Sequence, residues 1–148
     1  MHGAALAGGC GLATVCDVIF AADDSQFGYT ETAIGFIPAL VSIFLVRKIG
    51  EQHARELLLS ARRIAAEEAY SLGLVQYVVS CAVLEDATKE YALTVAKNSP
   101  SAIALTKSLL AAQHGMSIEA GLEYAASMNA LARGTEDTRK GIAKFLKK

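Results

Sequence analysis

The sequence predicts an α/β fold in which a layer of short strands and helices is followed by a purely helical region. Two observations lead to this prediction. Residues 1–80 are rich in glycine and aliphatic side chains, and they contain continuous apolar runs of strand length at 17–23 and 74–80. Residues 82–148 instead alternate apolar and charged side chains at helical spacing. We therefore expect two parts, residues 1–80 and residues 81–148.

Glycine and proline indicate where the elements of the first part begin and end. Pro38 suits the first position of a helix, and Gly50 suits the residue that ends it. The segment DDSQFG, residues 23–28, is typical of a turn. The helices predicted for this part cover 9–17, 38–50, 51–60 and 65–73.

The second part contains four amphipathic segments separated by turn signals. Ser99 and Ser117 stand where a serine would cap the start of a helix. Helices of this kind must bury their apolar stripes against something, either within the same chain or on a neighbouring one. The predicted helices cover 82–98, 100–114, 117–132 and 135–146.

Composition narrows the classes of partner. The formal net charge is -1, whereas a nucleic acid or an anionic membrane would require a basic face. Cys10, Cys16 and Cys81 lack the spacing of a zinc site or a disulfide framework, and we expect Cys10 and Cys16 to be small buried side chains. We find no signal-peptide pattern and no apolar run of about 20 residues. A cytoplasmic protein without metal, membrane or nucleic-acid partner is expected.

The stretch AGGCGLA, residues 7–13, places three glycines at the start of a predicted helix. Unpaired N–H groups at a helix start can hold an oxygen that becomes negative, and glycine lets a ligand approach them. The stretch could therefore stabilise an enolate or a tetrahedral intermediate. Close packing of a helix on a strand would explain the same glycines. On the residues alone, both readings stay open.

Glu31 is the second candidate. It lies among apolar residues and glycines in FGYTETAIGFIP, residues 27–38, a setting that could prepare a carboxyl group for proton transfer. The alternative is a glutamate in the first turn of a short helix that Thr30 caps.

Taken together, these stretches resemble the enoyl-CoA hydratase/isomerase (crotonase) superfamily. The stretch HGAALAGGCGLATVCDVIFAADDSQFGYTETAIGFIP is similar to the family pattern NGxxxGGGxELAxxCDxxxAxxxAxFGxPExxxGxxP, and ELLLSARRIAAEEAYSLGLVQYVV continues the match. The resemblance implies the C-terminal portion of the family's domain. It implies a partial ClpP/crotonase-like ββα spiral core in residues 1–80, and C-terminal helices in 81–148 that assemble trimers or hexamers.

The resemblance also assigns roles to single residues. Gly8 matches the glycine whose N–H forms half of an oxyanion hole, and Glu31 matches the second catalytic glutamate of the hydratases. Gly11 stands where those hydratases carry their first glutamate, so this chain lacks that carboxylate. Residues expected to meet the substrate or its CoA are Ala7, Gly9, Pro38, Phe145 and Lys148.

The function implied is a lyase reaction, the hydration of a 2-enoyl-CoA in fatty-acid or branched-chain acid catabolism. Coenzyme A enters as part of the substrate, and no other cofactor is expected. One alternative is an enoyl-CoA double-bond isomerase, which needs a single carboxylate and so suits Gly11 better. The other is a truncated fragment or accessory subunit without catalysis, which would still associate through its helices.

Overall fold

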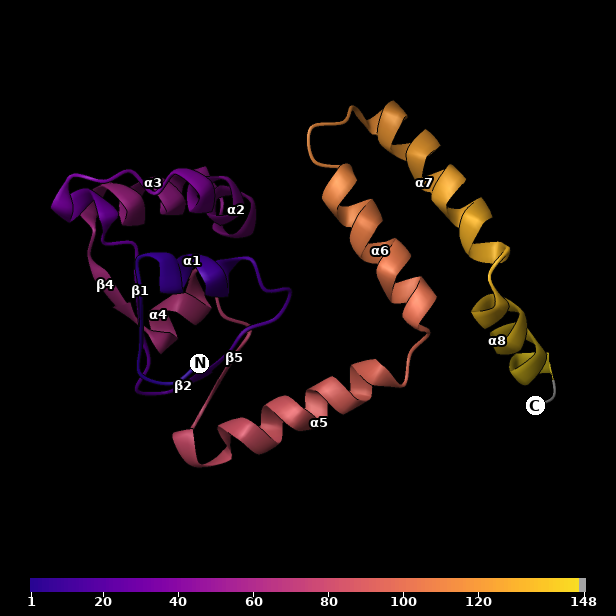
Figure 1. Cartoon of the computed structure of the whole chain (residues 1–148), viewed down its shortest axis with the longest axis horizontal. Helices are drawn as coiled ribbons and strands as arrows, with labels where there is room; N and C mark the ends of the chain where they lie inside the picture. The colour runs from indigo at the N-terminus through magenta and orange to yellow at the C-terminus, as the bar shows by residue number, and fades with distance from the viewer. Residues whose placement is uncertain (147–148) are drawn as a thin grey trace. The chain divides into compact units, whose positions relative to one another are not determined.

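A computed structural model describes residues 1–146. The chain divides into two units, Met1–Lys89 and Glu90–Lys148 (Figure 1). The first unit holds all the strands found in the described residues, and the second is helical. Among residues 1–146, no helix combines the length and the apolar character that a membrane span requires.

The first unit contains two small sheets. In the larger sheet, β1 (Ala4–Leu6) runs parallel to β3 (Gln26–Gly28), and β3 runs antiparallel to β4 (Arg63–Ala65). In the smaller sheet, β2 (Phe20–Ala22) pairs in parallel with β5 (Tyr77–Val79). The register of the parallel pair places Leu6 opposite Gly28, so β1 and β3 end side by side.

Helices connect these strands. The first is α1 (Gly8–Thr14), which packs against α2 (Ala39–Ile49), and α2 packs in turn against α3 (Glu51–Ser60). Gly50 separates α2 from α3 with φ +79°, a backbone conformation that favours glycine, as the sequence predicted. The remaining elements of the unit are η1 (Glu31–Ile34), α4 (Ala66–Ser71), η2 (Cys81–Val83) and the first turns of α5 (Leu84–Ala96).

One core joins the sheets and helices of the first unit. Phe27 and Tyr29 are its largest fully buried side chains, and both come from β3 or the residue that follows it. From α2 and α3, every third or fourth residue turns inward, as expected of helices with one buried face. The helical members are Val41, Leu45, Ile49, Ala54 and Leu57.

The predicted turn at residues 23–28 is wrong in its second half, where β3 lies. Polar residues and a glycine suggested a turn, but Phe27 is fully buried and pairs with Ala5 on one side and Ile64 on the other. Tertiary pairing overrides the local preference here.

The prediction that both Cys10 and Cys16 are buried is right for Cys10 alone. Cys16 is exposed and lies beyond the end of α1.

The second unit is built from the rest of α5 and from α6 (Pro100–Ala112), α7 (Ile118–Arg133) and α8 (Glu136–Leu146), close to the predicted ranges. The Ser99 and Ser117 side chains accept hydrogen bonds from the N–H groups of Ala102 and Ala120, which confirms both predicted caps. A carboxylate oxygen of Asp137, on α8, accepts hydrogen bonds from both Ser99 and Ser101.

Apolar side chains on these helices remain accessible. No side chain among residues 90–146 is buried. The largest exposed apolar side chains of α6, α7 and α8 are Leu110, Ile118, Leu122, Leu131, Ile142, Phe145 and Leu146. A set of this size on a small helical unit is typical of a surface that meets a partner.

Candidate functional site

Gly8 and Glu31 follow the carboxyl ends of two neighbouring parallel strands. Beyond the paired residues Leu6 and Gly28, the N–H of Ala7 donates a hydrogen bond of 2.8 Å to the Gly28 carbonyl oxygen. The chain then enters α1 at Gly8 on one side and η1 at Glu31 on the other. Open α/β sheets bind their ligands at this edge.

Ala7 holds a strained backbone conformation just before α1. Its φ of 47° and ψ of -125° lie in a region that L residues rarely occupy. Such a conformation costs about 1–3 kcal/mol and is often found at functional sites. It turns the chain sharply, so that α1 begins at once.

The start of α1 is open to an approaching ligand. Within the helix, the first intrahelical bond runs from the N–H of Gly11 to the Ala7 carbonyl oxygen, so the N–H groups before it have no such partner. A Cβ built on Gly8 would meet nothing within 4 Å. Packing therefore does not require glycine at this position, whereas close approach of a ligand to the backbone would favour it.

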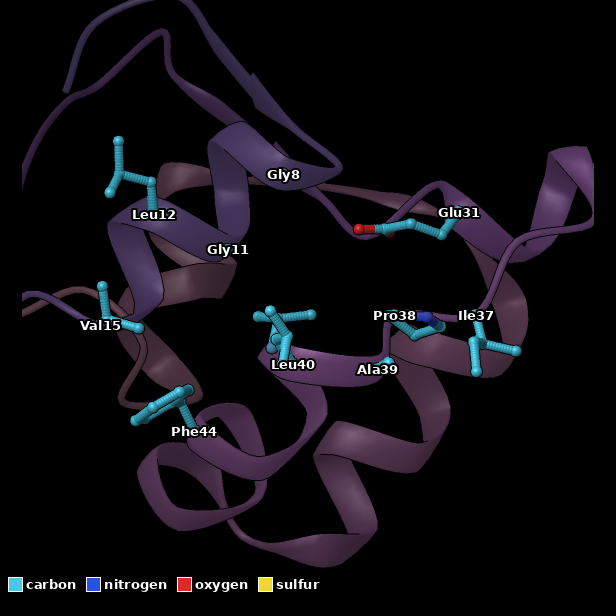
Figure 2. Close-up of a pocket in the computed structure, with 11 residues that line it drawn as sticks. Gly8, Gly11, Leu12, Val15, Glu31, Ile37, Pro38, Ala39, Leu40 and Phe44 are labelled. Carbon is cyan, nitrogen blue, oxygen red and sulfur yellow. The ribbon is translucent and has the colours of Figure 1, made fainter.

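Gly8 and Glu31 line the same pocket, whose volume is about 520 Å³. Its walls come from α1, from the segment around Pro38, and from the first turns of α2 (Figure 2). Within residues 1–146, Glu31 is the one ionisable side chain that lines it. The apolar lining is formed by Leu12, Val15, Ile37, Pro38, Ala39, Leu40, Val41 and Phe44.

The Glu31 carboxylate points toward α1 across this pocket (Figure 2). Its Oε2 atom is buried and has no hydrogen-bond partner within the part of the chain that the structure describes. A buried polar atom without a partner is costly, so a bound group that supplies a hydrogen bond or a proton would be favoured here. The alternative reading of Glu31 is right in part: Glu31 does begin a short helix, η1, but the Thr30 side chain makes no capping hydrogen bond.

Gly11 lies on the same pocket, one turn of α1 beyond Gly8. A Cβ at this position would lie 3.4 Å from the Val41 Cβ, an ordinary van der Waals contact. A Cβ at residue 11 would therefore be accommodated beside Val41. As the chain stands, α1 contributes no carboxylate to the pocket.

The other residues predicted for binding lie in different places. Pro38 lines the pocket. Ala7 immediately precedes Gly8, the first pocket residue of α1, and Gly9 lines a second cavity of about 320 Å³ instead. Phe145 lies exposed on α8 in the second unit. Lys148 is outside the described residues. Within residues 1–146, no three His, Cys, Asp or Glu side chains gather closely enough to hold a metal ion.

Sequence reasoning missed most of the apolar wall. Leu12 and Val15 lie three residues apart at the end of α1, and Leu40 and Phe44 lie four apart on α2. Such spacings place side chains on one face of a helix, which the sequence could have revealed. Leu40 is 80% exposed and Phe44 is 44% exposed, so this wall is open to solvent.

A buried polar cluster lies under α1. The Tyr29 hydroxyl is 2.6 Å from Thr14 Oγ1, which donates to the Cys10 carbonyl oxygen at 2.8 Å. Burial raises the pKa of the Cys10 thiol, and burial also holds the pKa of the Tyr29 hydroxyl above its usual range. Both groups therefore stay protonated at neutral pH and act as neutral hydrogen-bonding groups.

Lys48 secures the far end of α1. Its Nζ donates to the carbonyl oxygens of Thr14 and Cys16, at 3.1 and 2.5 Å. A cation at a helix C-terminus is favoured by the helix dipole. Partial burial lowers the pKa of this ammonium group. The contact fixes α1 to α2, and both helices line the pocket.

Comparison with known proteins gives a consistent result. A family model described as enoyl-CoA hydratase/isomerase matches residues 1–148. A Thermus thermophilus protein that carries an enoyl-CoA hydratase name is 45% identical over 148 residues, covering 100% of this chain and 58% of the relative. The 2,3-dehydroadipyl-CoA hydratase of Escherichia coli is 35% identical over 153 residues, with 100% and 58% covered.

Solved structures agree with the sequence relatives. The crystal structure of an enoyl-CoA hydratase from Bacillus anthracis matches with a TM-score of 0.92 and 35% identity, and the match covers 98% of this chain and 57% of that one. The first unit and the helical region thus have the fold of these hydratases. The chain spans less than three fifths of the length of the relatives that it matches.

Proposed function

This chain belongs to the enoyl-CoA hydratase/isomerase family, and from that premise we propose that it acts on unsaturated acyl-CoA thioesters by stabilising an enolate. The proposal is supported chiefly by the unpartnered Glu31 carboxylate oxygen, which faces the open start of α1 across one apolar pocket. Each part of that arrangement has a chemical task in the reaction.

The N–H of Gly8 would hold the thioester carbonyl oxygen. As the oxygen gains negative charge in the enolate, a backbone donor at a helix start stabilises it more than it stabilises the neutral carbonyl. The strained Ala7 conformation directs this donor before substrate arrives, so the stabilisation needs no reorganisation during the reaction.

Glu31 would transfer the protons of hydration. Its carboxylate takes a proton from water while the water oxygen bonds to the β-carbon of the enoyl group. The π electrons of the double bond then move toward the carbonyl oxygen as an enolate. The enolate collapses by taking that proton from Glu31 at the α-carbon, which restores the carboxylate. One molecule of water is added in total, and no further reactant is consumed.

The glycine at position 11, where the hydratases carry a glutamate, favours a second candidate function, double-bond isomerisation. Hydration is usually shared between two carboxylates, but in the described part of the chain the pocket lining offers only Glu31. Moving a double bond needs one base, which removes a proton from the γ-carbon and returns it to the α-carbon through the same enolate. A chain with a single carboxylate can complete that cycle without water.

Product analysis in ¹⁸O-labelled water separates the candidates. Hydration incorporates solvent oxygen into a 3-hydroxyacyl product, whereas isomerisation gives a shifted double bond without label. Acyl-CoA binding without either product would mean that this chain needs a further protein segment for catalysis. Gly11→Glu places a second carboxylate beside Val41, and it should raise the ratio of hydrated to isomerised product.

We further propose a homotrimer or hexamer in the cytoplasm, in which residues 81–148 provide the oligomerisation region beside a spiral core in 1–80. The exposed apolar side chains of α6, α7 and α8 support this assignment. Phe145 and Lys148 would then meet the CoA portion of the substrate, which serves without any other cofactor. Light scattering on the purified chain measures the assembly, and a monomer at micromolar concentration would contradict it.

A further inference from the structure

Tyr29 connects the two segments that form the candidate site. Its hydroxyl reaches Thr14 in the last turn of α1, the helix that begins at Gly8. Its main chain leads directly to Glu31, two residues later. The Tyr29 side chain is 1% exposed and Thr14 is 3% exposed, so bulk water does not compete for this contact.

The direction of the hydrogen bond follows from the protons available. The hydroxyl of Thr14 has one proton, which it donates to the Cys10 carbonyl oxygen. While that proton is donated to the Cys10 carbonyl oxygen, the Tyr29 hydroxyl is the donor to Thr14 Oγ1. Tyr29 thus ends a chain of two hydrogen bonds that runs into the main chain of α1.

Two of the polar links between α1 and the Glu31 segment lie near the two ends of the helix, and between them the Cys10 thiol also interacts with the Tyr29 hydroxyl. The first is the main-chain bond from Ala7 to Gly28, just before the start of α1. The second, from Tyr29 to Thr14, lies at the other end of the helix. Lys48 holds the last turn of α1 to α2, whereas the Tyr29 hydroxyl ties the same end of the helix to the Glu31 segment. The two links thus tie both ends of α1 to that segment.

We infer that the Tyr29–Thr14 hydroxyl pair is a positioning device that holds the start of α1 and Glu31 in a fixed mutual geometry. Its consequence for catalysis rests on the proposed function, but its mechanical effect does not. Buried and fully satisfied polar networks commonly enforce a single arrangement in this way.

Amide hydrogen exchange tests the mechanical effect without reference to activity. In Tyr29→Phe, the ring and the Thr14–Cys10 bond remain, so the core keeps its shape and no donor is orphaned. We expect exchange in residues 8–14 and 29–34 to rise together, by roughly threefold to tenfold for the loss of one hydrogen bond. Exchange in α3 should not change. A uniform rise across the first unit, or no rise, would overturn the inference.

Matched variants identify the contact. Thr14→Val removes the acceptor and should reproduce the effect of Tyr29→Phe, whereas Thr14→Ser keeps the hydroxyl and should behave as wild type. Tyr70→Phe deletes an exposed hydroxyl on α4 and serves as the control for the substitution itself. An equal response from Tyr70→Phe would count against the inference.

Kinetics then tests the catalytic consequence. If the wild type turns over an enoyl thioester, Tyr29→Phe should lower kcat by roughly threefold to tenfold while KM stays within about twofold, because positioning acts on the transition state. An unchanged kcat would overturn the catalytic role. If the wild type neither binds nor converts acyl-CoA, the proposed function fails, and the exchange data alone decide the mechanical role.

Discussion

The N–H of Ala7 donates a 2.8 Å hydrogen bond to the carbonyl oxygen of Gly28. From this bond the two segments of the candidate site diverge, one into α1 at Gly8 and the other into η1 at Glu31. The geometry that brings an N–H group and a carboxylate to one pocket is thus set by the register of two parallel strands. Substitutions around this junction should separate effects on folding from effects on chemistry.

Gly8→Ala should impair the reaction without harming the fold. The added Cβ meets no atom within 4 Å, and alanine favours a helix over glycine, so the free energy of unfolding should stay equal or rise by about 0.5–1 kcal/mol. The methyl group would keep the thioester oxygen from the N–H, which should lower kcat/KM on the order of 10²-fold. Gly121→Ala, equally open on α7, is the control. Unchanged kcat/KM in Gly8→Ala would exclude this N–H as the oxyanion donor.

Ala7→Gly should stabilise the protein. Glycine accepts the observed φ of 47°, so relief of about 1–3 kcal/mol of strain exceeds the 0.5–1 kcal/mol that glycine costs in conformational entropy. We expect urea unfolding to show a net gain of roughly 1 kcal/mol. Ala61→Gly, at φ 54° and outside the pocket, should also stabilise the chain. A loss of stability in Ala7→Gly would mean that Ala7 is not strained.

The pocket should favour substrates whose acyl chain ends in an apolar group over those whose chain ends in a carboxylate. Apart from Glu31, no charged side chain of residues 1–146 lines the pocket, and a terminal carboxylate would lack a partner among them. Turnover of 2-hexenoyl-CoA should therefore exceed that of 2,3-dehydroadipyl-CoA, its counterpart with a terminal carboxylate, by about tenfold in kcat/KM. Leu40→Lys adds a cation to the wall and should narrow this gap. Equal turnover of both substrates by the wild type would show that the acyl chain lies elsewhere.

Asp137 should make the second unit sensitive to acid. Hydrogen bonds from Ser99 and Ser101 hold the pKa of its carboxyl group below the usual value. Because the folded pKa is depressed, the stabilisation is complete above the unfolded pKa of about 4 and is lost as the pH falls through the folded pKa. Asp137→Asn should have a lower free energy of unfolding at pH 7 than the wild type. When unfolding is followed by circular dichroism, its stability should no longer show this dependence on acid. Glu136→Gln, next to it, should keep the dependence, and loss of it there would contradict the assignment.

Local signals predicted the helical part of the fold well. Gly50 ends α2, Ser99 and Ser117 cap their helices, and amphipathic spacing located α5 to α8 within a few residues. The strands were harder, because β1, β3 and β4 have three residues each and are defined by their partners. The local sequence of residues 26–28 is typical of a turn, and only the pairing of Phe27 with two other strands shows that these residues form a strand.

The candidate site was predictable only in part. Gly8, Gly11, Glu31 and Pro38 were identified from the sequence, and they do line one pocket. The positive φ of Ala7 was not foreseen, because alanine gives no local sign of such a conformation. The contact between Tyr29 and Thr14 joins residues 15 positions apart, so only the packing of α1 on the sheet reveals it.

Enoyl-thioester absorbance, followed with the wild type and with Glu31→Gln, tests the central claim most directly. Glutamine keeps the shape of Glu31 but cannot take up a proton, so turnover should fall by about 10²–10⁴-fold while acyl-CoA binding persists. Glu67→Gln, on the surface of α4, should leave turnover unchanged. If Glu31→Gln consumes the thioester as fast as the wild type, Glu31 is not the acid–base group and the proposed site is wrong.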